Sequence, residues 1–114
     1  LAHELNKLGL PGIQFTPIRF TPTASVFKGE VCGGVRIAIT DRAALHPVEA
    51  GIAIACTLQR LYPKEFKLDL VNTLLNRKAS MNAMREGDAW KKVVAGWEAE
   101  TQAFKMRRKN FLRY

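Results

Sequence analysis

The sequence predicts a small α+β domain in which an antiparallel pair of strands packs against helices. Two segments, near 13–21 and 30–40, alternate apolar and polar residues as half-buried strands do. Other segments repeat apolar residues every three or four positions, which is typical of helices with one buried face. A helix, two successive strands and then more helices is the order of an α+β fold rather than of βαβ units. We therefore expect a small antiparallel sheet packed against three or more helices.

The first half of the chain is expected to supply one helix and both strands. Residues 2–8 read as a helix that ends before a turn at Leu10-Pro11-Gly12. In the first strand, Pro17 predicts an edge position or a bulge, because proline has no amide proton to donate to the ladder. In the second strand, Gly33-Gly34 predicts a bulge or a close approach of another group. Residues 22–29 are expected to form the connecting loop.

The second half is expected to be mainly helical. A core helix is predicted from Pro47, a favoured first residue, to Tyr62, because Pro63 cannot continue it. Residues 66–70 read as a third, short strand, and residues 71–86 as one or two short helices that end at Gly87.

The last helix is predicted to run from Asp88, a residue suited to capping, toward the C-terminus. Trp90, Trp97, Phe104 and Phe111 share its apolar stripe at helical spacing. We expect the two tryptophans to be core residues rather than a platform for stacking sugars.

Length and composition limit the classes of function. A chain of 114 residues, 47% of them hydrophobic, is expected to form a single domain over 1–114 that folds by itself. No apolar run approaches the roughly 18 residues of a membrane span. Two histidines and two cysteines leave little material for a metal centre, so neither a metal nor a cofactor is expected.

The net charge of +8 raises the alternative of a nucleic-acid partner. Five of the positive charges lie near the C-terminus: Lys105, Arg107, Arg108, Lys109 and Arg113. Basic residues in the last turns of a helix also complement its dipole, and no nucleic-acid motif accompanies them. We therefore expect no nucleic-acid partner.

Among the residues that could carry chemistry, Glu30 and Cys32 are the strongest candidates. Both are expected on one face of the second strand, about 7 Å apart. Glu30 is read as a solvated strand end or as a contact to a substrate or another domain. Cys32 is read as a small buried residue, with a disulfide to Cys56 left open in case of export. Glycosidases need two carboxylates, and no second acid accompanies Glu30, so no catalytic residue is assigned.

Several segments together resemble the C-terminal domain of the NamZ-type exo-β-N-acetylmuramidases, a bacterial family. The matching segments include Leu10-Pro11-Gly12-Ile13-Gln14-Phe15, Phe27-Lys28-Gly29-Glu30-Val31-Cys32-Gly33-Gly34-Val35, Pro47-Val48-Glu49-Ala50-Gly51, Leu61-Tyr62-Pro63-Lys64-Glu65-Phe66 and the terminal Phe111-Leu112-Arg113-Tyr114. The resemblance covers the whole chain and is weakest over residues 70–86, where Asn72 and Asn76 depart from the family pattern.

The resemblance implies a glycoside hydrolase that releases N-acetylmuramic acid from the non-reducing ends of peptidoglycan fragments. Its partners would be muropeptides or disaccharides and a larger, Rossmann-like N-terminal domain that holds the catalytic carboxylates. Glu30 and Cys32 carry over only as candidates for substrate binding or the domain interface. This chain alone is expected to be inactive, and the complete protein to be extracytoplasmic. The alternative function is an independent basic module that binds nucleic acid or an anionic cell-wall polymer.

Overall fold

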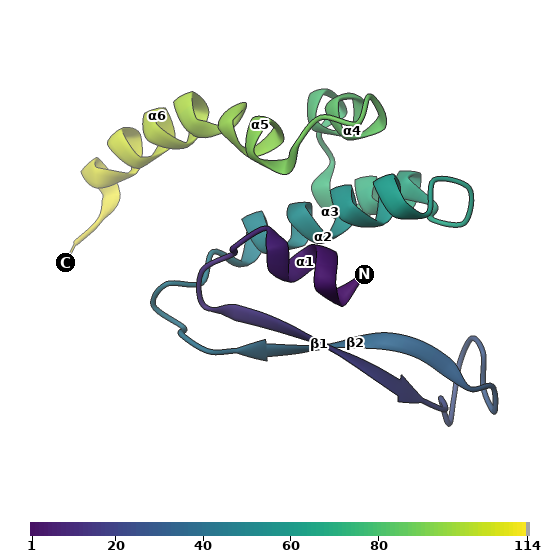
Figure 1. Cartoon of the computed structure of the whole chain (residues 1–114). Coiled ribbons are helices and arrows are strands. Elements are labelled where there is room, and N and C mark those ends of the chain that lie inside the picture. The colour runs from purple at the N-terminus through teal and green to yellow at the C-terminus, as the bar shows by residue number, and fades with distance from the viewer. Residues whose placement is uncertain (114) are drawn as a thin grey trace.

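A two-stranded hairpin and a succession of helices make up the structure, a computed structural model that describes residues 1–113 (Figure 1). The predicted α+β class is confirmed. In chain order the elements are α1 (Ala2–Lys7), β1 (Ile13–Phe20), β2 (Cys32–Ile39), α2 (Pro47–Leu61), the 3-10 helix η1 (Leu68–Val71), α3 (Asn72–Leu75), α4 (Lys78–Arg85), α5 (Trp90–Ala95), α6 (Glu98–Arg108) and the 3-10 helix η2 (Lys109–Phe111).

The two strands pair in one unbroken antiparallel register, from Ile13 opposite Ile39 to Phe20 opposite Cys32. The bulge considered for each strand is therefore absent. Both strands of a two-stranded sheet are edges, so Pro17 is tolerated without a bulge. Gly34 instead lets the Phe20 ring lie close to the backbone of β2, because a Cβ atom at Gly34 would lie 2.7 Å from a ring carbon of Phe20.

A tight turn ties the base of the hairpin to the segment before α2. Gly12 adopts a φ of +71°, a conformation that glycine reaches without a Cβ penalty. Its carbonyl oxygen accepts hydrogen bonds from the backbone amides of Thr40, at 2.9 Å, and Asp41, at 3.3 Å. The Asp41 carboxylate in turn accepts the amides of Ala43 and Ala44, which orders the approach to α2.

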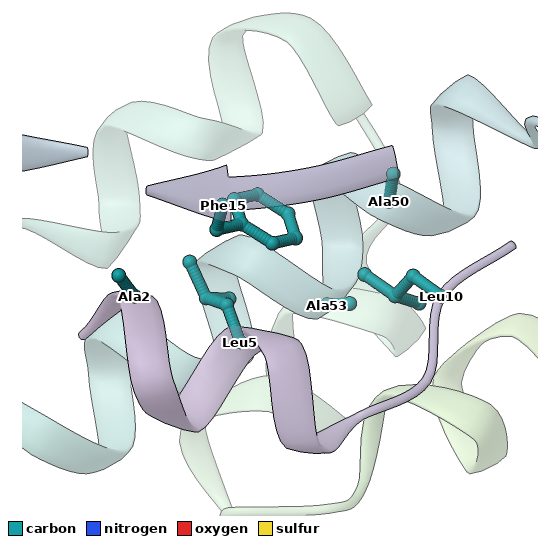
Figure 2. Close-up of a cluster of buried hydrophobic side chains, with 6 residues drawn as sticks. All are labelled: Ala2, Leu5, Leu10, Phe15, Ala50 and Ala53. Atoms are coloured by element: carbon teal, nitrogen blue, oxygen red, sulfur yellow. The ribbon is translucent and has the colours of Figure 1, made fainter. Parts of the chain in front are cut away.

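The helix α2 contributes to two separate apolar clusters. On one side lie α1 and the first half of β1, which together with α2 bury Ala2, Leu5, Leu10, Phe15, Ala50 and Ala53 (Figure 2). On the other side, α2 packs with η1, α4 and α5 and buries Ile52, Ala55, Leu68, Met81, Met84 and Val93. The partly buried Trp90 packs against both clusters. The predicted core role of α2 is confirmed.

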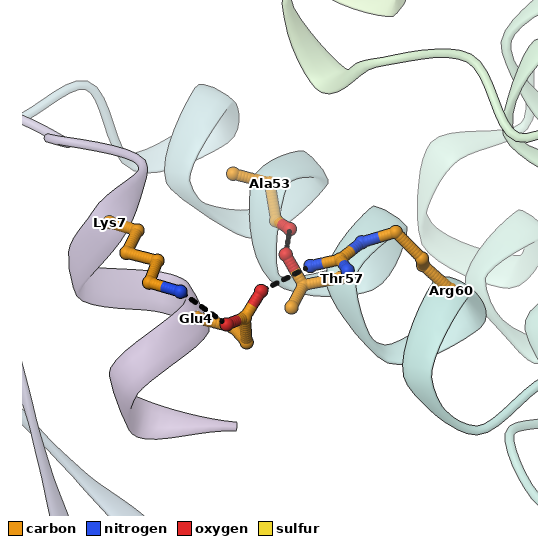
Figure 3. A network of polar contacts seen from close by, with 5 residues as sticks. All are labelled: Glu4, Lys7, Ala53, Thr57 and Arg60. Carbon is orange, nitrogen blue, oxygen red and sulfur yellow. Dashed lines mark hydrogen bonds and ion pairs between the residues drawn. The ribbon is translucent and has the colours of Figure 1, made fainter.

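Polar contacts fix α1 between the strand and α2. The Glu4 carboxylate lies 3.0 Å from Lys7 Nζ and 2.9 Å from an Arg60 guanidinium nitrogen, so it joins α1 to the end of α2 (Figure 3). On the other side of the helix, the Asn6 side-chain amide both donates to the Phe15 carbonyl oxygen and accepts from the Phe15 amide, at 2.7 and 3.0 Å. Asn6 thus pairs with β1 as a neighbouring strand would.

The predicted third strand at 66–70 is wrong. The backbone there makes short-range hydrogen bonds, such as Leu68 N–H to the Phe66 carbonyl and Leu70 N–H to the Lys67 carbonyl, and enters η1. Only Leu68 of the apparent alternation is buried, whereas Leu70 is 67% exposed. No strand lies beside this segment among residues 1–113, so a ladder has nothing to pair with.

The predicted single C-terminal helix is also wrong, because the chain breaks into α5 and α6 at Gly96 and Trp97. Glycine is among the poorest helix formers, and the Gly96 carbonyl oxygen is left to accept a bond from Arg77. Asp88 does not cap α5, because α5 begins at Trp90 and its N-cap residue is Ala89. Its carboxylate pairs with Lys92 one turn further on, at 2.8 Å.

The apolar stripe of the last helix is covered only at its beginning. Trp97 is partly buried against the second cluster, but α6 has no buried residue and extends to one end of the molecule (Figure 1). Phe104 is 52% exposed and Phe111 78% exposed. Within residues 1–113, none of the helices combines the length and the apolar character that crossing a membrane requires.

Candidate functional site

Glu30 lies on the loop at the far end of the hairpin, two residues before β2 begins. The prediction that it opens the strand is therefore wrong. Its backbone amide donates to the Phe27 carbonyl oxygen at 3.0 Å, and its side chain is exposed. The loop carries Ser25 and Phe27 at positive φ and leaves Val26 and Val31 at least 70% exposed. This hairpin end consequently presents one carboxylate among uncovered apolar side chains.

Cys32 begins β2 directly opposite Phe20 and is only partly buried, whereas the sequence predicted a buried residue. Its thiol lies 3.6 Å from the Glu30 backbone carbonyl oxygen, which it can use as an acceptor. The structure thus brings Cys32 to the backbone of Glu30 without placing the two side chains on one strand face. Cys32 and Cys56 are both free thiols, so the disulfide left open by the sequence does not form. Burial, assisted by the charge of Asp88, raises the pKa of the Cys56 thiol, so this sulfur is no ready nucleophile.

A groove with a volume of about 630 Å³ lies where the hairpin passes the start of α1 and the end of α2. The hairpin contributes residues of both strands. The start of α1 contributes Ala2 and the preceding Leu1, and the end of α2 contributes Leu58 and the following Tyr62. The lining residues are Leu1, Ala2, Pro17, Ile18, Arg19, Gly33, Gly34, Val35, Leu58 and Tyr62. The groove therefore joins an apolar helix surface to a strand that carries a positive charge.

The hairpin register places Arg19 directly opposite Gly33. Directly opposed residues of an antiparallel pair share a face, so the Arg19 side chain has no side chain across from it. A Cβ atom at Gly33 would meet no atom within 4 Å, which leaves the strand backbone open at this point. Glu30 and Cys32 do not line the groove, but the next residues of the same segment do.

The acidic residues are mostly engaged in structural contacts. Glu4 pairs with Arg60, Asp69 with Arg85, and Glu100 with Arg77. The hydrogen bond from Arg60, followed by that from Lys7, lowers the pKa of Glu4 to about 2. Arg77 lowers the pKa of Glu100 in the same way. A general acid of a glycosidase needs a raised pKa, so neither carboxyl group fits that role.

The second aromatic and charged cluster surrounds Trp97. Arg77 reaches both carboxylate oxygens of Glu100, at 2.7 and 2.8 Å, and thereby ties the start of α4 to α6. The Trp97 indole N–H donates to the buried Ser80 hydroxyl at 2.7 Å. These contacts confirm that Trp97 has a structural role, although its ring is only partly buried. Over the described range 1–113, no three histidine, cysteine, aspartate or glutamate side chains gather as metal ligands would.

Comparison with known proteins assigns this arrangement to a family. The family described as the C-terminal part of the exo-β-N-acetylmuramidase NamZ matches residues 1–114. The chain belongs to this family. The NamZ resemblance drawn from the motifs is therefore confirmed over the whole sequence. A curated relative, the peptidoglycan β-N-acetylmuramidase NamZ of Bacillus subtilis strain 168, is 32% identical over 118 residues.

The chain spans only part of its NamZ-type relatives. All of it aligns with the Bacillus subtilis protein, but it covers 28% of that protein's length. A crystal structure of a DUF1343 family protein from Bacteroides fragilis NCTC 9343 superimposes on the whole chain with a TM-score of 0.65 and 22% identity, and the chain covers 33% of it. The likeness to that structure shows that the two share a fold.

The groove is the feature that sequence reasoning missed in this NamZ domain. Arg19 and Arg36 look alike in the sequence, since both lie within strands of alternating polarity. The pairing register separates them, because it places Arg19 opposite a glycine and Arg36 opposite Thr16 on the other face. The Gly33-Gly34 pair was the available signal, and it points to the groove once the register is known.

Proposed function

We propose that this chain is the C-terminal domain of an exo-β-N-acetylmuramidase that releases N-acetylmuramic acid from the non-reducing ends of peptidoglycan fragments. One observation carries the proposal: the NamZ C-terminal family matches the chain from its first residue to its last. The relative named for this activity is about three and a half times as long as the aligned region, since the chain covers 28% of it. We propose that a larger, Rossmann-like N-terminal domain completes the enzyme.

The carboxylates of the chain support a division of labour between the two domains. Inverting glycosidases hold two carboxyl groups about 6.5–9.5 Å apart, and retaining ones about 5–5.5 Å apart. Here Glu4, Asp69 and Glu100 are bound to arginines, whereas Glu30, on the hairpin loop, forms no ion pair with any of the residues 1–113. We propose, as the resemblance to the NamZ family implies, that the N-terminal domain supplies the catalytic pair.

In this proposal the far end of the hairpin faces the cleft between the domains. Glu30 offers an exposed carboxylate there, and Cys32 orders the backbone beside it through the Glu30 carbonyl. The exposed side chains of Val26, Phe27 and Val31 would be covered by the second domain. Muropeptides or disaccharides would bind in the cleft, and the enzyme would act outside the cytoplasmic membrane, where peptidoglycan lies.

The test is the release of N-acetylmuramic acid from a synthetic N-acetylmuramyl–N-acetylglucosamine disaccharide. A longer polypeptide that contains this chain after an N-terminal domain should release the sugar, and the 114-residue chain alone should not. Absence of release by the longer polypeptide would contradict the proposed function. Release by the 114-residue chain would contradict the division of labour.

The charge on α6 favours a second candidate, an independent module that binds an anionic polymer. Lys105, Arg107 and Arg108 lie on an exposed helix with no buried residue. Such a cluster gives attraction that weakens steeply with salt. Sub-micromolar binding of duplex DNA or of an anionic cell-wall polymer at physiological salt, which weakens steeply when the salt is doubled, would favour this candidate over the muramidase domain.

A further inference from the structure

We propose that the groove between the hairpin and the helices α1 and α2 is a binding site for a carboxylate-bearing saccharide, with Arg19 holding the carboxylate. The inference rests on the proposed function for the identity of the sugar. It goes beyond that function in naming a site within this chain, away from Glu30 and Cys32.

The charge of Arg19 is available to a ligand. The guanidinium groups of Arg60, Arg77 and Arg85 are all paired with carboxylates. Arg19 forms no ion pair or side-chain hydrogen bond with any of the residues 1–113, and it borders the groove. A guanidinium binds a carboxylate through two parallel hydrogen bonds, which gives both attraction and a defined orientation.

The glycine opposite Arg19 leaves room for the ligand. Gly33 has no atom within 4 Å of the position that a Cβ would take, and its backbone conformation is one that other residues can adopt. A side chain at this position would project from the strand face that also carries Arg19. The absence of a side chain therefore keeps the space beside the guanidinium open.

The remaining walls of the groove suit one sugar ring. Leu58 and Val35 offer apolar surface to the C–H face of a ring, and Tyr62, which is 43% exposed, adds an aromatic face with a hydroxyl group. A volume of about 630 Å³ lies within the range of small-molecule sites. N-acetylmuramic acid combines such a ring with a lactyl carboxylate, which N-acetylglucosamine lacks. The geometry therefore favours the former.

The experiment is a titration of the ¹⁵N-labelled 114-residue chain with N-acetylmuramic acid, followed by NMR. We expect saturable shifts at the amides of Gly33, Gly34 and Val35. N-acetylglucosamine and acetate, which supply the ring and the anion separately, should each bind at least about 10-fold more weakly, because each lacks one half of the contacts. Equal affinity for acetate would overturn the assignment to a saccharide.

Two variants and a matched control test the residues. Arg19→Gln should weaken binding by about 10-fold or more, since it removes a charged hydrogen-bonding group. Arg36→Gln removes the same charge from the other face of the hairpin and should leave the affinity unchanged. Gly33→Leu should block the site by filling it, while the dispersion of the spectrum shows that the fold is intact. Unchanged affinity in Arg19→Gln would overturn the proposal.

The outcomes separate this inference from the proposed function. If the sugar causes no saturable shift while a longer polypeptide releases N-acetylmuramic acid, the groove is not a site and the proposed function holds. If binding depends on Arg19 but the longer polypeptide has no muramidase activity, the site holds and the proposed function is wrong.

Discussion

Replacing Gly12 by alanine should destabilise the fold by about 2–4 kcal/mol, because backbone strain and a steric clash in the folded state outweigh the lower entropy of the unfolded chain. The left-handed conformation, at a φ of +71°, costs an L-residue about 1–2 kcal/mol. The new Cβ would collide with the Asp41 carbonyl oxygen and lie 2.8 Å from the Leu45 backbone nitrogen. Relieving such overpacking costs about 1–3 kcal/mol more. Alanine also lowers the conformational entropy of the unfolded chain, which offsets about 0.4–1 kcal/mol of this loss of stability.

Gly9→Ala is the matched control for this prediction. Gly9 has a similar φ of +63°, but a Cβ there would meet nothing within 4 Å. Only the strain of the left-handed backbone and the lower entropy of the unfolded chain remain, so Gly9→Ala should lower the free energy of unfolding by about 1 kcal/mol or less. Urea unfolding followed by tryptophan fluorescence measures both variants. Equal losses for Gly9→Ala and Gly12→Ala would refute the argument that the backbone contacts at Gly12 dominate.

Three further substitutions test other contacts. Trp97→Phe should lower the free energy of unfolding in urea by about 1–3 kcal/mol, because it leaves the buried Ser80 hydroxyl without its hydrogen-bond donor. If the losses of stability in Trp97→Phe and Ser80→Ala simply add in the double variant, the two residues are not coupled and this reasoning is wrong. The pKa of Glu4 is lowered by its hydrogen bonds to about 2, so its contribution to stability is present above its ordinary value of 4.5 and is lost as the pH falls toward 2. The difference in melting temperature between the wild type and Glu4→Gln should therefore shrink as the pH falls from 4.5 through 2, and a constant difference would contradict the Arg60 contact. Glu30→Gln in a longer muramidase should reduce kcat/KM by roughly 10- to 150-fold if Glu30 faces the cleft, and wild-type kinetics would remove it from the site.

The parts of the fold that depend on local pattern were predictable. The alternation of the two strands and the proline at the start of α2 fix those elements within one or two residues, because each signal lies within the element itself. The class of the fold follows from the order of these elements. The motifs gave the family for the same reason, since they are contiguous segments of sequence.

Features that depend on partners distant in the sequence were not predictable. The 66–70 segment alternates like a strand, but a strand also needs a neighbour, and none is near it among residues 1–113. The break at Gly96 coincides with a carbonyl that Arg77, the residue before α4, contacts. Arg19 enters the groove only because the register opposes it to Gly33, and a strand's register is set by its loop and its partner together.

The position of α2 between two apolar clusters has a consequence for how the domain opens. Ala53 faces one cluster and Ile52 the other, so neither half can separate from α2 without exposing part of this helix. Amide protons in the middle of α2 should therefore exchange with deuterium only through global unfolding. The amides of α6, which has no buried residue, should exchange through local fraying that leaves the rest protected. The amides of α2 are thus protected from exchange until the whole domain unfolds, whereas those of α6 exchange independently of the rest. A partner domain that covers α6 would be detected first as slower amide exchange in α6.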